Sequence, residues 1–135
     1  MSKEVTVRGI IIKDNQVILM YRRKNGVEYY AIPGGHLENN ESNEECLIRE
    51  IKEEFSIDVK VIKLLGKVEK NNKIDYIYSC EWIDGELLLG GEEKIISNSE
   101  NYYEIRKVNI KDIDKIELYK ENLDMIKKVI NERTI

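Results

Sequence analysis

The feature that most constrains the fold is a change in the spacing of apolar residues near residue 42. Before this point the apolar side chains form short β-branched runs separated by turn residues such as Asp14-Asn15, which indicates strands. From Ser42 to Phe55 they recur every three or four positions, which is the period of an α-helix. A chain that uses both periods is predicted to be an α/β protein with a mixed sheet.

The rest of the chain extends this alternation. Strands are expected at residues 5–13, 17–22, 27–32, 57–68, 74–82 and 102–109, helices at 42–55 and 121–132, and a loop at 90–101. Pro33-Gly34-Gly35 is expected to end regular structure, because proline lacks an N–H and glycine tolerates positive φ. The sequence has no internal repeat or linker, so one domain spanning residues 1–135 is expected.

Composition argues against several classes of protein. The net charge of −4 argues against a general nucleic-acid-binding protein, which needs a basic surface. No apolar run approaches the roughly 20 residues of a membrane helix. The first residues lack the apolar segment of a signal peptide, so a cytoplasmic location is expected. Cys46 and Cys80 are expected to be buried, reduced thiols.

The predicted helix has one apolar face, which is expected to point to the core. Leu47, Ile48, Ile51 and Phe55 fall within an arc of roughly 100° on a helical projection. Residues 42–45 have the capping-box pattern, in which a serine and a glutamate satisfy each other's main-chain N–H groups. The helix is therefore expected to begin there.

The same helix carries three carboxylates on a second face. Glu50, Glu53 and Glu54 are three and four positions apart, so they lie side by side. Like charges at this spacing repel by about a few tenths of a kcal/mol per pair on an exposed helix. A hard cation such as Mg²⁺ makes the cluster favourable, because it takes oxygen ligands. The helix by itself is consistent with either a metal site or a solvated acidic face.

The loop before the helix shifts this balance toward a metal site. Gly34 and Gly35 allow a tight turn that aims a main-chain carbonyl at the same cation. Glu38 and Glu41 add two supporting carboxylates on the way into the helix. Magnesium held by carboxylates is the usual partner of substrate phosphates, so a phosphate-bearing substrate is expected.

This segment resembles the Nudix box, G-x5-E-x7-R-E-U-x-E-E-x-G-U, in which U is bulky and apolar. Eight of the nine specified positions match at the correct spacing, namely Gly35, Glu41, Arg49, Glu50, Ile51, Glu53, Glu54 and Ile57. Ser56 stands where the box has glycine. Because this position follows the helix, a serine with positive φ is expected to cost on the order of 1 kcal/mol without affecting the ligands.

The resemblance implies a fold, an activity and a cofactor. The implied fold is the Nudix fold, an α/β/α sandwich with a central mixed β-sheet. The implied activity is hydrolysis of a nucleoside diphosphate linked to another group, X, with Mg²⁺ or Mn²⁺. The resemblance assigns metal binding to Glu50, Glu53 and Glu54, with the carbonyl of Gly34 as a further ligand. It assigns to Arg49 the orientation of these carboxylates through charge-assisted hydrogen bonds.

Two assignments among the acidic residues stay open. A carboxylate has to accept the proton of the attacking water, and Glu50 is the first candidate. In this family the base can instead come from a distant loop, where Glu92 and Glu93 are available and Glu104 follows; Glu93 is the candidate for an additional ligand or base. Glu41 either supports the metal site or stabilises the helix N-terminus through the helix dipole.

Arg22, Tyr30 and Gly35 are the candidate substrate-binding residues. Arg22 and its neighbour Arg23 can hold a phosphate bidentately or form surface salt bridges. His36 is the only histidine and is interpreted as incidental, so a nucleophilic triad is not expected. Several tyrosines either stack on a base or belong to the core and its rim: Tyr30, Tyr76, Tyr102 and Tyr103.

The sequence therefore leads to two functional hypotheses of different class. The first is a pyrophosphohydrolase acting on a nucleoside triphosphate, an oxidised nucleotide or a related NDP-X compound. The second is a Nudix-fold sensor that binds a nucleotide without turnover. Such sensors usually lose box carboxylates and this chain keeps them, which favours the enzyme. The expected partner is a small nucleotide, with neither nucleic acid nor membrane, for a monomer or a homodimer.

Overall fold

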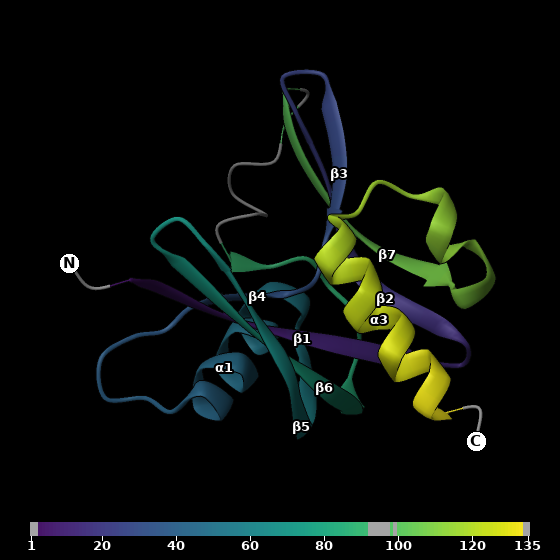
Figure 1. Cartoon of the computed structure of the whole chain (residues 1–135). Helices are drawn as coiled ribbons and strands as arrows, with labels where there is room; N and C mark the ends of the chain where they lie inside the picture. The colour runs from purple at the N-terminus through teal and green to yellow at the C-terminus, as the bar shows by residue number, and fades with distance from the viewer. Residues whose placement is uncertain (1–2, 92–97, 99, 134–135) are drawn as a thin grey trace.

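The computed structural model describes residues 3–91, 98 and 100–133. Its elements run from the N-terminus to the C-terminus as coloured in Figure 1. They are β1 (Glu4–Lys13), β2 (Gln16–Lys24), β3 (Val27–Ala31), β4 (Gly34–His36), α1 (Asn43–Phe55), β5 (Ile57–Lys70), β6 (Lys73–Gly85), β7 (Asn101–Asn109), the 3-10 helix η1 (Ile110–Lys115) and α3 (Lys120–Arg133). Every strand and helix expected from the sequence is present, with shifts of a few residues at the ends.

One local prediction is corrected and one short element is added. Regular structure does not end at Pro33-Gly34-Gly35, because residues 34–36 form β4, which pairs antiparallel with β1. Glycine makes this pairing possible: a Cβ on Gly34 would lie 1.9 Å from the carbonyl oxygen of Val7. The short helix η1 at residues 110–115 was not predicted at all.

The strands form a mixed sheet, as the sequence predicts. Their order is β3-β2-β1-β6-β5, with β4 on β1 and β7 on β2. The β1–β6 pair is parallel, from Glu4 opposite Lys73 to Ile11 opposite Cys80. The other pairs are antiparallel. This topology brings β7, late in the sequence, beside β2 near its beginning.

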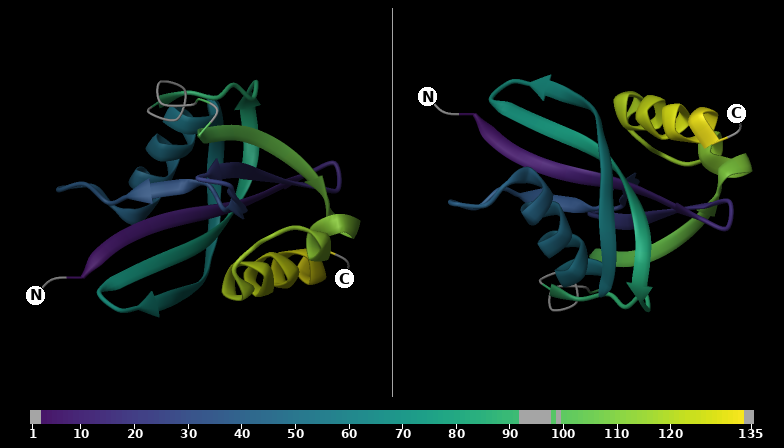
Figure 2. Two further views of the ribbon diagram at one scale, coloured as in Figure 1. Left: turned by 90° about the horizontal axis from the view of Figure 1, so that it is seen from above. Right: turned by 90° about the horizontal axis from the view of Figure 1, so that it is seen from below.

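The two helices lie on opposite sides of the strands, α1 on one side and α3 on the other (Figures 1 and 2). Helix α1 buries Cys46, Leu47, Ile51 and Phe55 against one apolar cluster. The prediction that Ile48 faces the core is wrong, since its side chain is 41% exposed. The buried side of α1 instead includes Cys46, because β4 packs closely against the start of the helix. The Cys46 thiol contacts the carbonyl oxygen of His36 in β4 at 3.4 Å.

A second apolar cluster lies beneath α3. The helix buries Ile126 and Val129 there. The prediction of reduced, buried thiols is consistent with the structure, in which Cys46 and Cys80 are both free and buried, and burial raises the pKa of each thiol to about 12. Within the described ranges no helix is both long and apolar enough to span a membrane. The cytoplasmic location stays a prediction.

Candidate functional site

The candidate site is a cavity of about 560 Å³ beside α1 and β4. It brings together most of the residues singled out from the sequence: Arg22, Gly34, Gly35, Glu38, Arg49, Glu50, Glu53 and Glu54. Glu41 lies just outside the lining and contacts it through Arg49. Glu92 and Glu93 fall outside the described residues, so the role expected for Glu93 stays a prediction.

The position of the carboxylates follows from how α1 begins and packs. The helix starts after Ser42, whose side chain accepts a hydrogen bond from the Glu45 N–H at 3.1 Å. The Glu45 carboxylate accepts one from the Ser42 N–H at 2.8 Å, which completes the predicted capping box. Because the apolar side of α1 is fixed against the sheet, its acidic side is turned to the cavity.

Gly35 lets the helix approach β4 closely. A Cβ on this residue would lie 2.3 Å from the Glu50 carboxyl carbon, far inside van der Waals contact. In the register of the sheet, Gly35 is opposite Val7 and Gly34 is opposite Arg8. The Glu50 carboxylate therefore lies directly against the main chain of β4, beside the residue whose carbonyl was predicted to bind metal.

Glu50, Glu53 and Glu54 of α1 form, with β4, one wall of the cavity, called the carboxylate wall below. Arg49 connects the carboxylates of this wall through hydrogen bonds. Its Nη2 donates to Glu41 Oε1 at 2.7 Å, and its Nε donates to Glu41 Oε2 at 3.1 Å. Its Nη1 donates to Glu50 at 3.0 Å and to Glu53 at 3.3 Å. The hydrogen bond from Arg49 is the main cause that lowers the pKa of Glu41 to about 2. The same bond raises the pKa of Arg49 above its usual value.

The donor set of this wall suits a hard divalent cation. Glu50, Glu53 and Glu54 supply carboxylate oxygens, and β4 supplies main-chain carbonyls, which are the ligands that Mg²⁺ and Mn²⁺ prefer. Across the described chain no group of three or more acidic, histidine or cysteine side chains lies close enough together to hold a metal ion. In this arrangement Nη1 of Arg49 donates to both Glu50 and Glu53. The residues thus fit the ion by the chemistry of their donors.

The opposite wall of the cavity is built from Arg22 of β2 and Tyr103 of β7. Nη2 of Arg22 donates to the Tyr103 hydroxyl at 2.5 Å. The guanidinium carbon lies 4.5 Å from the Tyr103 ring centroid and 5.5 Å from that of Tyr29. Nε of Arg22 is buried and has no hydrogen-bond partner among the described residues. Arg22 lines the cavity and brings a positive charge to it, which suits an anionic ligand.

Tyr30 is the one candidate substrate-binding residue that the structure separates from this cavity. It pairs with Tyr21 across β2 and β3, whereas Tyr29 pairs with Arg22. Since neighbouring residues of a strand point to opposite faces, the Tyr30 side chain points away from Arg22. Its hydroxyl accepts a hydrogen bond from Arg106 at 2.8 Å instead, and it lines a different cavity.

Sequence reasoning missed Arg8, which also lines the cavity. Its Nη1 donates to the carbonyl oxygen of Ile32 at 2.9 Å, immediately before the β4 turn. Its Nε lies 3.7 Å from the Asp75 carboxylate, which also accepts a hydrogen bond from Thr6. The available signal was a charged residue in the middle of the strand, just before its apolar second half.

Ser56 adopts the left-handed conformation that the box glycine would favour, with φ of 63°. Its hydroxyl donates to the carbonyl oxygen of Leu88 at 2.9 Å. The N–H groups of Leu88 and Gly90 in turn donate to the carbonyls of Phe55 and Glu54 at the helix end. These bonds attach residues 88–90 to the carboxylate helix and offset part of the strain at Ser56.

Comparisons with known proteins identify the family to which the chain belongs. The family model of the NUDIX domain matches residues 3–128. An ADP-ribose pyrophosphatase from Methanocaldococcus jannaschii is 38% identical over 97 residues, which cover 67% of this chain and 57% of that protein. An 8-oxo-dGTP diphosphatase from Proteus vulgaris is 33% identical over 82 residues, which cover 55% of this chain and 73% of that protein.

The fold is shared with solved structures at lower identity. A NUDIX hydrolase from Nitrosomonas europaea superposes with a TM-score of 0.75 at 18% identity, over 97% of this chain and 90% of that one. At this identity the likeness concerns the fold, which has the mixed sheet and flanking helices described above. The sequence match of the family model over nearly the whole chain carries the assignment. The chain therefore belongs to the Nudix family.

Proposed function

We propose that this protein is a metal-dependent pyrophosphohydrolase that cleaves the diphosphate linkage of a nucleoside diphosphate joined to a group X. Nucleoside triphosphates, oxidised nucleotides and related NDP-X compounds are the candidate substrates. The observation that carries the proposal is the meeting of Glu50, Glu53 and Glu54 with Gly34 and Arg22 in one cavity. Relatives named as an ADP-ribose pyrophosphatase and an 8-oxo-dGTP diphosphatase support it.

Mg²⁺ or Mn²⁺ would be held by Glu50, Glu53 and Glu54 together with the carbonyl of Gly34. When bound, the cation neutralises charge that develops on the phosphate oxygens. Arg49 orients this set, because it donates hydrogen bonds to Glu50 and Glu53 and is itself anchored by Glu41. Glu38, whose carboxylate lies 3.6 Å from Arg49, supports the same network.

Glu50 is the proposed general base for the attacking water. Its carboxylate lies against the main chain of Gly35 and accepts a hydrogen bond from Arg49, so its orientation is set on two sides. A base has to lie within hydrogen-bond reach of the proton that it removes. Glu93 is the alternative base or an additional ligand, from the segment outside the described residues.

Arg22 is the proposed phosphate-binding residue of the opposite wall. Tyr103 holds one of its nitrogens, and the residue lines the cavity with its positive charge. Arginine binds phosphate with two parallel donors, so fixing the plane of the guanidinium favours recognition. Gly35 contributes indirectly, because the absence of a Cβ lets the Glu50 carboxylate lie against its main chain.

The test compares wild-type protein with Glu53→Gln and with Glu44→Gln. Glu44 lies in the first turn of α1 and is exposed outside the cavity, so its variant is the matched control. Each protein is incubated with Mg²⁺ or Mn²⁺ and a panel of NTPs, dNTPs, 8-oxo-dGTP, ADP-ribose, dinucleoside polyphosphates and nucleotide sugars. Metal-dependent release of a mononucleotide is expected from wild type and control. Glu53→Gln is expected to be at least about a hundredfold slower.

Two outcomes contradict the proposal in different ways. If a compound binds at the metal site by calorimetry but none turns over, the protein is a nucleotide sensor. If nothing binds and Mg²⁺ leaves thermal stability unchanged, the acidic face of α1 is a solvated surface.

A further inference from the structure

Arg8 connects the turn before β4 to strand β1 of the central sheet. Its Nη1 donates to the carbonyl oxygen of Ile32 at 2.9 Å. The N–H of the next residue, Gly9, donates to the carbonyl oxygen of Pro33 at 2.9 Å. The carbonyls of the two residues that precede Gly34 are therefore both held by β1, one through a side chain and one through the main chain.

Asp75 of β6 holds Arg8 from the other side. Its carboxylate forms an ion pair with Nε of Arg8 at 3.7 Å and accepts a hydrogen bond from the Thr6 hydroxyl. Thr6 lies directly opposite Asp75 in the parallel β1–β6 pair, and only 1% of it is exposed. A buried hydroxyl thus fixes the position of the carboxylate. Through this contact Arg8 links β6 to the turn before β4.

The partners of Arg8 favour a role in holding the chain over a role in binding substrate. Ile10 and Ile12 point to the same face of β1 and pack in the apolar cluster beneath α3. An arginine on this face loses part of its hydration, since only 22% of its side chain is exposed, and the Asp75 carboxylate offsets that cost. The charge of Arg8 is therefore balanced within the protein, and two of its nitrogens are directed to protein groups.

The turn that Arg8 holds borders the candidate metal site. Gly34 supplies the proposed carbonyl ligand, and a Cβ on it would lie 2.7 Å from the Cα of Arg8, so the two main chains are in close contact. The next residue, Gly35, lies against the Glu50 carboxylate. Ile32 is only 1% exposed, so loss of the Arg8 donor would cost a hydrogen bond to the carbonyl of a buried residue. A turn that relaxes to recover a partner moves Gly34 and Gly35 with it.

We propose that Arg8 is a positioning residue of the candidate active site and that Asp75 keeps it in place. Arg8 holds the turn at residues 32–34, so that the Gly34 main chain and the Glu50 carboxylate keep a fixed relative position. The inference rests on the proposed function, because it assigns a role in the same metal site. Groups that orient metal ligands commonly change metal affinity by about 10-fold to 100-fold when they are removed.

The first test separates positioning from charge by comparing Arg8→Gln with Arg8→Lys. Lysine keeps the positive charge but places it on a single nitrogen, whereas arginine uses two separate nitrogens for Ile32 and Asp75. Both variants are therefore expected to weaken Mn²⁺ binding about tenfold, measured by calorimetry without substrate. With the best substrate of the nucleotide panel, both are expected to lower kcat about tenfold with a smaller change in KM.

The second test, Asp75→Asn, loosens Arg8 without replacing a residue that lines the cavity. Asparagine keeps an acceptor for the Thr6 hydroxyl but loses the charge that pairs with Arg8. Because Arg8 is then held less firmly, Mn²⁺ affinity and kcat are both expected to fall about threefold. If Arg8 binds a substrate phosphate instead, loss of the Asp75 charge leaves the guanidinium available to the substrate. In that case KM would fall and Mn²⁺ affinity would stay unchanged, which contradicts the proposal.

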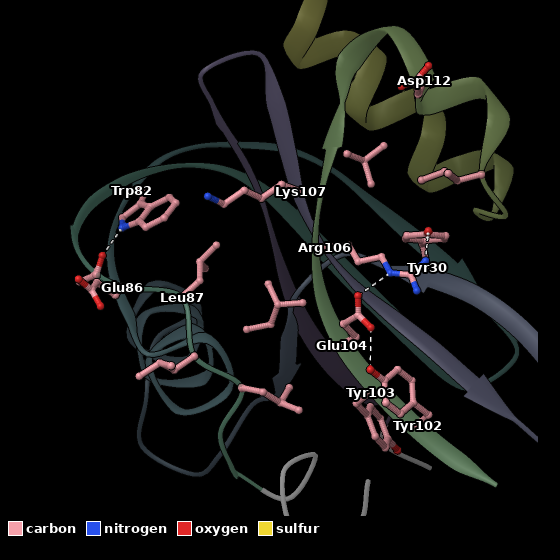
Figure 3. A pocket seen from close by; sticks show the side chains of 16 residues that line it. Tyr30, Trp82, Glu86, Leu87, Tyr102, Tyr103, Glu104, Arg106, Lys107 and Asp112 are labelled. Carbon is pink, nitrogen blue, oxygen red and sulfur yellow. Dashed lines mark hydrogen bonds and ion pairs between the residues drawn. The ribbon is translucent and has the colours of Figure 1, made fainter. Parts of the chain in front are cut away.

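Arg106 of β7 is the matched control arginine. It also lies in a strand, pairs with the Glu104 carboxylate at 2.9 Å and donates to the Tyr30 hydroxyl at 2.8 Å. It lines a separate cavity of about 1070 Å³, shown in Figure 3. Arg106→Gln and Arg106→Lys are therefore expected to bind Mn²⁺ and turn over substrate like wild type. Urea denaturation establishes that each variant is folded, and hydrogen exchange is expected to be faster at residues 34–37 in the Arg8 variants only.

Two further results overturn the role of Arg8 alone. One is wild-type Mn²⁺ affinity and kcat in Arg8→Gln, and the other is recovery of both by Arg8→Lys, which would mean that only the charge matters. If wild type binds no Mn²⁺, the proposed function and this inference are both overturned. Mn²⁺ binding and hydrogen exchange need no turnover, so they decide the role of Arg8 even if the protein is a nucleotide sensor.

Discussion

The two walls of the candidate site are built in different ways. The carboxylate wall comes from one stretch of chain, residues 34–54, in which the helix spacing places Glu50, Glu53 and Glu54 together. The opposite wall joins Arg22 and Tyr103, which are 81 positions apart and meet because β2 pairs with β7. One wall is thus a local motif, and the other exists only in the folded sheet.

The walls also differ in how their polar groups are held. Arg49 binds the carboxylate wall through a network of charged groups that includes Glu41 and Glu50. Arg22 instead lies among the tyrosine rings and makes one hydrogen bond to a hydroxyl. We therefore expect changes in the first wall to affect catalysis strongly, and changes in the second to affect mainly substrate binding.

Gly35→Ala is expected to give the largest effect. The new Cβ would lie 2.3 Å from the Glu50 carboxyl carbon, so the carboxylate has to move. A displacement of this size is expected to lower kcat/KM by about a hundredfold, while unfolding by urea changes little because the end of a Glu side chain is flexible. Gly66→Ala, whose Cβ would meet Met125 at 2.7 Å, is the control and should keep full activity. Full activity of Gly35→Ala would show that Glu50 does not work from this position.

Tyr103→Phe tests the second wall. The change removes the hydroxyl that accepts the Arg22 hydrogen bond but keeps the ring beside the guanidinium. We expect KM to rise about threefold to tenfold with a smaller change in kcat, because substrate binding is weakened more than chemistry. Tyr102→Phe is the control, since its hydroxyl donates to Glu104 rather than to the cavity. If kcat of Tyr103→Phe fell by as large a factor as KM rose, the two walls would not differ in their effects on catalysis and substrate binding.

Substitutions at Ser56 test how far the stability of the carboxylate helix α1 depends on its hydrogen bonds to residues 88–90. Ser56→Ala loses the hydrogen bond to Leu88 and keeps the left-handed φ of 63°, so a loss of about 1 kcal/mol in the free energy of unfolding is expected. Ser56→Gly loses the same bond but relieves the strain, so it should be more stable than the alanine variant by about 1 kcal/mol. Urea denaturation measures both. Equal stability of the two variants would mean that the backbone there is unstrained.

The smallest expected effect is the contribution of Glu41 to the pH dependence of the free energy of unfolding. Its pKa is about 2 in the folded protein against an ordinary value of 4.5, because Arg49 donates hydrogen bonds to it. A lowered folded pKa contributes stability that is present above pH 4.5 and is lost as pH falls from there toward 2. The gap in unfolding free energy between wild type and Glu41→Gln should therefore narrow over this range. Glu44→Gln is the control, and a gap that stays constant with pH would contradict the expectation.

Much of the fold was predictable because the local sequence pattern indicates most of the strands and helices. The β-branched runs, the capping box at Ser42 and the helical period up to Phe55 all matched the structure. The predictions were wrong at positions where tertiary contacts determine the local structure or the burial of a side chain. Ile48 is exposed because β4 turns the buried arc of α1, and β4 itself forms because Gly34 allows β1 to approach closely.

The sequence by itself determined the carboxylate wall, because the rise and turn of an α-helix convert residue spacing directly into position. Only the tertiary structure decided that Tyr103 reaches Arg22, that Tyr30 points away and that Arg8 lines the cavity. The physical reason is that a strand's neighbours and faces are set by register. A shift of one residue moves every side chain to the other face, and the spacing of residues within one strand does not reveal which strand will pair with it.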